Sequence, residues 1–190
     1  MQWPNSGAVE TTHNIMTGKK YGNGTMTEAQ YLSWIRSALR SRWLRWLPRA
    51  EALKQAQVPY VGENTRRKYS YRCAICSELF SQKDCEVDHH PHDAGSIRSL
   101  DDIGPFVGRL FCEIDNLRVL CKKCHSVYTY AQKQGINFEQ ALVEKKVIET
   151  LKDKKKTLDL CTKMGYNTST LTNEAKRRAA LQEIFSKGET

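Results

Sequence analysis

The strongest signal in the sequence is the stretch Asp115-Asn116-Leu117-Arg118-Val119-Leu120-Cys121-Lys122-Lys123-Cys124-His125. An earlier Cys-x-x-Cys pair is formed by Cys73 and Cys76. Two thiolates separated by two residues can turn toward one ion, and two such pairs complete the tetrahedral set that structural zinc prefers. One pair can arise by chance, but two pairs make ordinary buried cysteines a poor explanation. We therefore expect Cys73, Cys76, Cys121 and Cys124 to bind one structural zinc ion.

A second motif, Val87-Asp88-His89, lies between the two cysteine pairs. Residues 86–89 predict a strand, residues 116–120 a second extended segment, and residues 121–133 a helix. Because side chains alternate along a strand, His90 falls on the face opposite His89, and we interpret it as a structural or supporting residue. His92 and Asp93 are alternative metal ligands.

This pattern resembles the HNH endonuclease superfamily, whose core has the ββα-metal fold. The family motif runs from a Cys-x-x-Cys pair, through an apolar strand ending in Asp-His and a central Asn-Leu, to Leu-Cys-x-x-Cys-His. The sequence is similar to small free-standing HNH endonucleases of bacteriophages, which carry counterparts of its segments 96–102 and 110–113. The likeness covers residues 27–130. It departs from those relatives at Tyr128, where they commonly have a lysine.

The resemblance implies a metal-dependent endonuclease that hydrolyses phosphodiester bonds of double-stranded DNA. His89 would be the general base that takes a proton from the attacking water, a task that suits a neutral imidazole. Asp88 and His125 would bind a catalytic cation, Mg²⁺ or Mn²⁺, with other divalent ions as alternatives. Asn116 would brace the loop and orient His89. The cation would stabilise charge on the scissile phosphate and on the leaving 3′ oxygen.

The charge of the chain favours a polyanionic partner. The net charge is +9 and the sequence pI is about 9.2. Residues 31–72 hold ten basic and two acidic residues, whereas residues 73–130 hold six basic and nine acidic residues. Basic side chains around an acidic centre suit a protein that neutralises phosphates. We predict DNA contacts, with a solvated helix face as the alternative, for Arg36, Arg40, Arg42, Arg45, Arg66, Arg67 and Lys68.

The expected fold class is α+β, mostly helical, with a small zinc-bound ββα-metal core flanked by basic helices. We expect four regions: a disordered leader (1–26), a basic helical region (27–65), the zinc-binding nuclease core (66–135) and a charged helical region (136–190). Thr27 is the predicted N-cap of a helix that Pro48 ends or kinks. The apolar stripe of that helix comprises Leu32, Ile35, Leu39, Trp43 and Trp46. Two further helices are predicted over residues 137–156 and 173–185.

The sequence contains no run of about 18 apolar residues, so we expect no membrane span. No secretory signal is evident, and we expect the seven cysteines to be reduced in a cytoplasm, that of the host if a phage encodes the chain. One alternative reading is a non-catalytic, zinc-stabilised DNA-binding protein or an accessory to genome packaging. A third is a nuclease for branched DNA. The oligomeric state and any partner in phage packaging or replication stay open.

Overall fold

The computed structural model describes residues 18–64, 66–91 and 93–188. In this part of the chain, helices predominate over three small sheets, which confirms the α+β class. The contacts divide the chain into two compact units, one ending at Leu120 and the other starting at Cys121.

The first unit carries all the described strands. In chain order its main elements are β1 (Lys19–Tyr21), β2 (Met26–Thr27), α2 (Glu28–Trp43), α3 (Leu47–Gln55), β3 (Gln57–Pro59), β4 (Tyr69–Arg72), β5 (Leu79–Phe80), β6 (Cys85–His89), α4 (Ile103–Leu110) and β7 (Leu117–Cys121). The strands form the sheets β1-β2, β3-β4-β5 and β6-β7. In the three-stranded sheet the neighbours are antiparallel, with Val58 opposite Ser70 and Tyr71 opposite Phe80.

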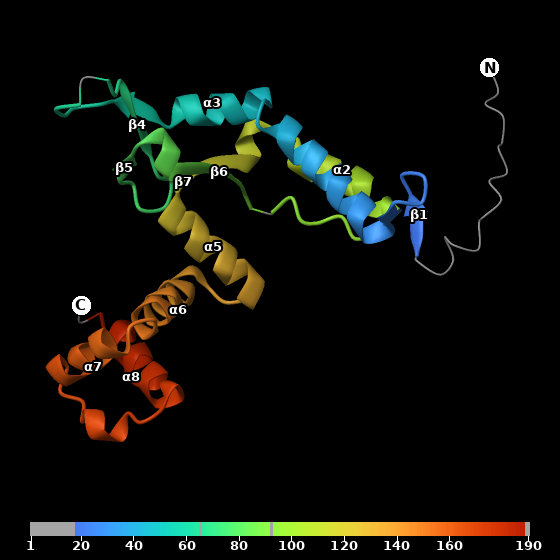
Figure 1. Ribbon diagram of the computed structural model, residues 1–190. Coiled ribbons are helices and arrows are strands. Elements are labelled where there is room, and N and C mark those ends of the chain that lie inside the picture. The colour runs from blue at the N-terminus through green and yellow to red at the C-terminus, as the bar shows by residue number, and fades with distance from the viewer. Residues whose placement is uncertain (1–17, 65, 92, 189–190) are drawn as a thin grey trace, which may run out of the picture. The chain divides into compact units, whose positions relative to one another are not determined.

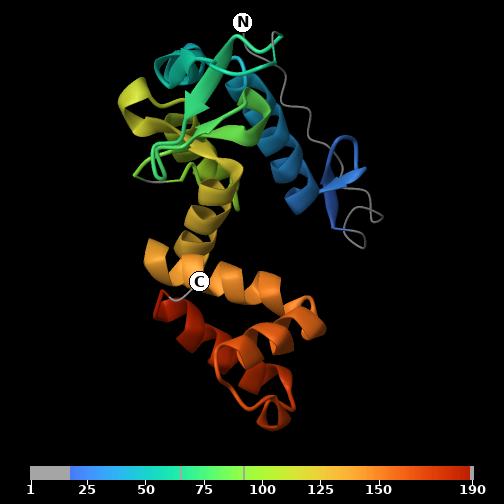
Figure 2. The same ribbon diagram turned by 90° about the vertical axis from the view of Figure 1, so that its left-hand side faces the viewer.

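An antiparallel hairpin, β1-β2, opens the described part of the chain. Three consecutive residues with positive φ, Gly22, Asn23 and Gly24, close its turn, a conformation that glycine and asparagine adopt at low cost. The hairpin lies beside the N-terminal end of α2 in both views (Figures 1 and 2). The prediction of a disordered leader is therefore wrong for residues 18–26, while residues 1–17 lie outside the described residues.

Helix α2 begins where the sequence predicts. The Oγ1 of Thr27 accepts the backbone N–H of Gln30 at 3.3 Å, and the Oε1 of Gln30 accepts the N–H of Thr27 at 2.9 Å, which completes a capping box. The helix ends at Trp43, so Trp46 lies outside it, contrary to the prediction. Pro48 instead occupies the first turn of α3, where no helical N–H is required.

Two apolar clusters fix the middle of the first unit. In one, Leu32 packs with Phe106 and Leu110 of α4, and the half-buried Ile35, Leu39 and Trp43 of the predicted stripe pack against them. The other cluster joins α3, β4, β6 and β7 through Ala52, Tyr71, Val87 and Val119. Strand β6, which carries Asp88 and His89, is therefore held by apolar side chains on the strand itself and on its neighbours.

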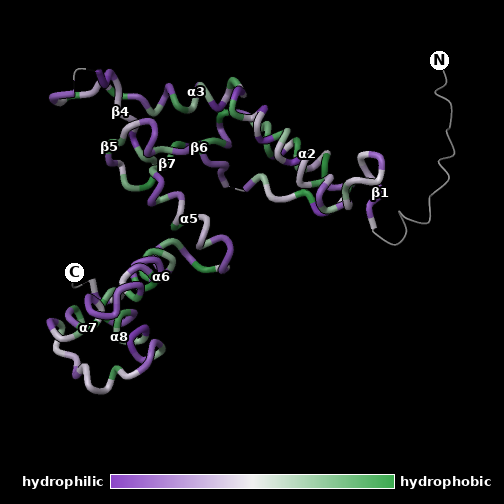
Figure 3. The backbone as a smooth tube through the Cα atoms, viewed as in Figure 1, coloured by the Kyte–Doolittle hydropathy of each residue, from purple (hydrophilic) through white to green (hydrophobic). Residues whose placement is uncertain are grey.

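The second unit consists of helices. They are α5 (Lys122–Gln134), α6 (Phe138–Leu151), α7 (Lys154–Lys163) and α8 (Glu174–Ser186). Each mixes hydrophobic and hydrophilic residues along its length, as expected of helices with one buried side (Figure 3). The buried members of the core shared by α6, α7 and α8 are Val147, Cys161, Leu171, Ala180, Leu181 and Ile184.

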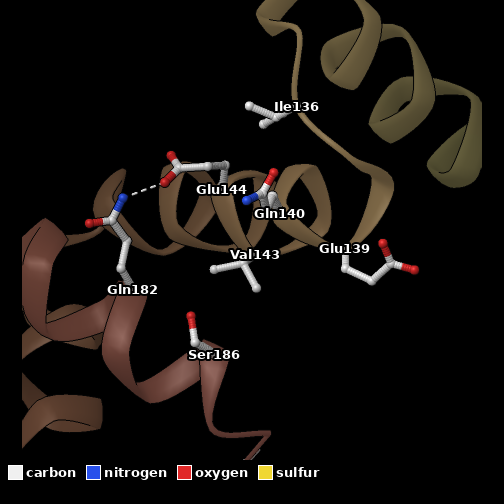
Figure 4. Close-up of a pocket in the computed structure, with 7 residues that line it drawn as sticks. All are labelled: Ile136, Glu139, Gln140, Val143, Glu144, Gln182 and Ser186. Atoms are coloured by element: carbon white, nitrogen blue, oxygen red, sulfur yellow. Dashed lines mark hydrogen bonds between the residues drawn. The ribbon is translucent and has the colours of Figure 1, made fainter.

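A polar contact also joins α6 to α8. Glu144 accepts a hydrogen bond from the side chain of Gln182, and its Oε2 lies 2.8 Å from Nη1 of Arg178. Figure 4 shows Glu144 and Gln182 facing each other above a hollow of about 540 Å³ that Val143 also lines. The contact lies beside the apolar core of the three helices and adds a directional link to it.

Helix α7 is a feature that the sequence prediction missed. The predicted helix over residues 137–156 stops at Leu151, and a new helix begins at Lys154. Asp153 starts it, because its carboxylate accepts the N–H of Lys156 at 3.0 Å. The sequence signal for this helix start is a single aspartate, and it is easily overlooked within a lysine-rich run.

Among the described residues, no helix is both long and apolar enough to cross a membrane.

Candidate metal centre and active site

The four cysteines of the two Cys-x-x-Cys pairs come together, as predicted. The sulfurs of Cys73, Cys76, Cys121 and Cys124 all lie within 4.8 Å of one another, and three of the four residues are buried. Among the residues that the structure describes, no other group of three or more histidine, cysteine or acidic side chains is gathered in this way. The cluster is therefore a candidate metal centre.

The backbone around the first pair explains why its sulfurs converge. Cys73 follows β4, and a tight turn leads from it to β5. The N–H of Ser77 donates to the carbonyl of Cys73 at 2.9 Å, and the N–H of Cys73 donates to the carbonyl of Glu78 at 3.0 Å. Ser77 has a φ of 59°, the left-handed conformation that such a turn requires. Both sulfurs of the pair therefore belong to one compact, internally bonded turn.

The second pair lies at the junction of β7 and α5. Cys121 is the last residue of β7 and the N-cap of α5, and its Sγ accepts the N–H of Cys124 at 3.3 Å. The first turn of the helix thereby sets the two sulfurs side by side.

The donor set fits zinc. With Zn–S bonds of about 2.3 Å, a tetrahedral site places its sulfurs about 3.8 Å apart, which the limit of 4.8 Å accommodates. Four thiolates leave no open position for substrate or water, so the ion would act as a structural link.

Asp88 forms an ion pair that the sequence did not predict. Its Oδ2 lies 3.0 Å from Nη2 of Arg118 and accepts the Nε–H of the same guanidinium at 3.1 Å. The two side chains are only 12% and 16% exposed. Because partial burial weakens screening by water, the Coulomb attraction between the two charges is greater than in a fully exposed pair. A cation that binds Asp88 must share this carboxylate with Arg118 or displace the arginine from it.

His89 is buried and held from two sides. Its Nε2 lies 3.0 Å from the carbonyl oxygen of Leu110, and its ring stacks on Trp43 with 4.9 Å between centroids. A carbonyl oxygen can only accept, so Nε2 carries the hydrogen in this contact and Nδ1 keeps the lone pair. The partners fix both the tautomer and the plane of the imidazole.

Asn116 and His90 lie at the rim of a cavity of about 230 Å³. The N–H of His90 donates to the carbonyl of Asn116 at 2.9 Å, which joins the ends of β6 and β7. The cavity is also lined by Arg109, which donates to the carbonyl of Ala94 at 3.0 Å. The exposed Asn116 therefore links the strand ends through its backbone, which suits the bracing role predicted for it.

Other candidate ligands have separate placements. His125 lies half-buried in the first turn of α5, directly after Cys124. Asp93 is exposed, and His92 lies outside the described residues. Cys112 is half-buried, and burial raises the pKa of its thiol above the ordinary value, which disfavours the thiolate that a metal would bind.

The predicted DNA-contact residues divide into two groups. Three of them make side-chain contacts within the protein: Arg36 donates to the Oγ of Ser33, Arg40 donates to the carbonyl of Gly95, and Arg67 bonds to Tyr69 and Ser70. The other four, Arg42, Arg45, Arg66 and Lys68, are exposed, as is Arg40, while Arg36 and Arg67 are half-buried. The exposed group therefore has the better access to a phosphate backbone.

Sequence reasoning missed three residues around the candidate active site. Arg118 is adjacent to the Asn-Leu motif but was given no role, and Trp43 was assigned only to the helix stripe. Arg109 belongs to no motif of the sequence. No local pattern identifies these residues, because each reaches its partner through the tertiary fold.

Scans of protein-family models, curated proteins and solved structures found no match to this chain.

Proposed function

We propose that this protein is a metal-dependent HNH endonuclease that hydrolyses phosphodiester bonds in double-stranded DNA, as a nick or a double-strand cut. The observation that carries the proposal is His89, a buried histidine with a fixed tautomer beside an aspartate, in a chain whose four cysteines cluster as a zinc site. The strand order supports it further, because β6 pairs with β7 and β7 runs directly into α5, the order of elements in a ββα-metal core.

In the proposed reaction, His89 is the general base. The carbonyl of Leu110 holds the hydrogen on Nε2, so Nδ1 can take a proton from water as the water attacks phosphorus. Trp43 restricts rotation of the ring and thereby keeps this lone pair in one direction. A base held in one orientation avoids the entropy loss that a mobile side chain would incur at the transition state.

Asp88 and His125 are the proposed ligands of Mg²⁺ or Mn²⁺. One carboxylate and one imidazole leave most of the coordination sphere for water and for a phosphate oxygen. The cation, when bound, would supply positive charge to the phosphate and to the leaving oxygen. Asn116 would keep the ends of β6 and β7 together through its backbone contact with His90.

One observation favours the alternative, a non-catalytic zinc-stabilised DNA-binding protein or packaging accessory. Arg118 already neutralises Asp88 at 3.0 Å, and a carboxylate in such a pair is a poorer cation ligand. The nuclease proposal therefore requires Asp88 to exchange its partner or to accept both charges at once.

Incubation of supercoiled plasmid with the purified protein tests the proposal. We expect conversion to nicked or linear DNA with Mg²⁺ or Mn²⁺, and none without an added divalent ion. His89→Ala should reduce the rate at least about 100-fold, the usual contribution of a general base, while DNA binding persists. Asp88→Asn should also reduce it, whereas the matched change Asp159→Asn, at an exposed position on α7, should not.

The result distinguishes the two candidate functions. Plasmid that stays intact with every cation, while the protein still retards DNA in a gel, would support the binding protein. Cleavage at the wild-type rate by His89→Ala would refute the assigned base and leave the exposed His90 as the next candidate.

A further inference from the structure

Three aromatic rings form a continuous stack at the surface of the first unit. Tyr21 of β1 lies on Tyr31 of α2 with 4.3 Å between centroids and 7° between planes. Tyr31 in turn lies nearly parallel to Trp34, with 6.5 Å between centroids and 11° between planes. The stack ends at Trp34, which is 60% exposed. Trp34 thus presents an aromatic ring to solvent near the hairpin, and the half-buried Tyr31 and Tyr21 lie behind it.

The face of α2 that continues from Trp34 carries small side chains and then a cationic one. Ala38 and Ser41 follow at helical spacings of four and three residues, and both are exposed. The exposed Arg42 lies about 12 Å along the axis from Trp34, at 1.5 Å per residue. Glu28 is the only acidic residue of α2. Small side chains between an aromatic platform and a cation leave room for a chain that carries both flat rings and negative charge.

A single-stranded nucleic acid fits these features best. An unpaired base offers a flat face to an aromatic platform, whereas the bases inside a duplex stack only on each other. The phosphates of the same strand would meet Arg42, which is exposed on the same helix. A partner protein with an apolar surface would gain from Trp34 but not from this cation.

We infer that Tyr21, Tyr31 and Trp34 form a stacking platform for unpaired nucleotides, with Trp34 in contact with a base. The inference rests on the proposed function for its biological setting, since a nuclease that meets nicks, ends or junctions encounters unpaired bases. The platform would contribute to the choice of DNA structure and leave the hydrolytic step to the residues around His89.

Binding of two fluorescent oligonucleotides, without added divalent cation, tests the inference. One is a single-stranded DNA, and the other has the same length and phosphates but abasic sugars in place of its central nucleotides. Trp34→Ala should weaken binding of the first about 5- to 150-fold, the range for loss of one stacked base. Binding of the abasic oligonucleotide should stay unchanged. Trp34→Phe should restore most of the lost affinity.

Two controls make the outcome decisive. Leu44→Ala removes a side chain that is 58% exposed at the end of the same helix, and should affect neither oligonucleotide. Equal losses for both oligonucleotides in Trp34→Ala, or no loss for either, would overturn the inference. Because the assay scores binding, the result is independent of cleavage: a protein that never cuts plasmid can possess the platform, and a nuclease can lack it.

Discussion

At the scale of single residues, the decisive contact is the one between Asp88 and Arg118. Each charge lost water when the first unit folded, and each is compensated in part by the other. Removing one member of such a pair takes this compensation from the other buried charge, which costs more than the pair itself contributes. If Asp88 is a cation ligand, a divalent ion should compensate its negative charge when Arg118 is replaced.

Arg118→Gln should therefore destabilise the protein by about 3 kcal/mol in the absence of divalent ions. Added Mn²⁺ should recover part of that loss, because the carboxylate no longer shared with Arg118 then binds the ion more tightly than in the wild-type protein. Thermal unfolding with and without Mn²⁺ measures both effects. The double variant Asp88→Asn, Arg118→Gln serves as the control and should not respond to the ion. An identical response to Mn²⁺ in all three proteins would exclude Asp88 as its ligand.

At the scale of elements, helix α2 depends on its first turn. The capping box between Thr27 and Gln30 supplies acceptors to two backbone N–H groups that would otherwise have no hydrogen-bond partner within the helix. Thr27→Ala removes the side-chain acceptor and should lower the free energy of unfolding by about 1 kcal/mol. Thr27→Ser keeps the hydroxyl and should restore most of it. Urea denaturation of the three proteins decides the point, and equal midpoints would show that the box contributes nothing.

The short helical turn at residues 100–102 should make the stability of the protein depend on pH through Asp102. The backbone N–H groups of Arg98 and Ser99 donate to Asp102 and hold the pKa of its carboxyl below the ordinary value. A carboxyl with a lowered pKa in the folded state stabilises the fold above its unfolded pKa of about 4. This contribution is lost as pH falls through the folded-state pKa. Asp102→Asn should thus be less stable than wild type at neutral pH, and the difference should vanish in acid.

Denaturation as a function of pH measures this convergence. Asp101→Asn is the matched control, since Asp101 is the exposed neighbour and should show little difference from wild type at any pH. If Asp102→Asn were less stable than wild type by the same amount down to about pH 2, the cause would be lost packing and not a lost charge.

At the scale of the whole molecule, the sequence predicted those features that depend on neighbours in the chain. The start of α2 at Thr27 follows from a motif of four residues, and the cysteine cluster follows from two short spacings and the chemistry of zinc. The contact between His89 and Leu110 could not be foreseen, because α4 must first dock against α2 before that carbonyl meets the ring. The pairing of Asp88 with Arg118 likewise needs β6 beside β7.

The cysteine cluster should bind zinc and stabilise the fold through it. Purified protein should contain about one zinc ion per chain by elemental analysis, and Cys76→Ser should lose it, because three thiolates bind the ion far more weakly than four. Without the ion, the turn after β4 and the junction of β7 with α5 keep only contacts such as the hydrogen bond from the N–H of Ala74 to the carbonyl of Val119 at 2.8 Å. Cooperative thermal unfolding should therefore shift to lower temperature or disappear. A zinc chelator should have the same effect on the wild type. Cys112→Ser, outside the cluster, should keep both the zinc and the transition. A zinc-free wild-type protein with an undiminished transition would show that packing alone brings the four sulfurs together.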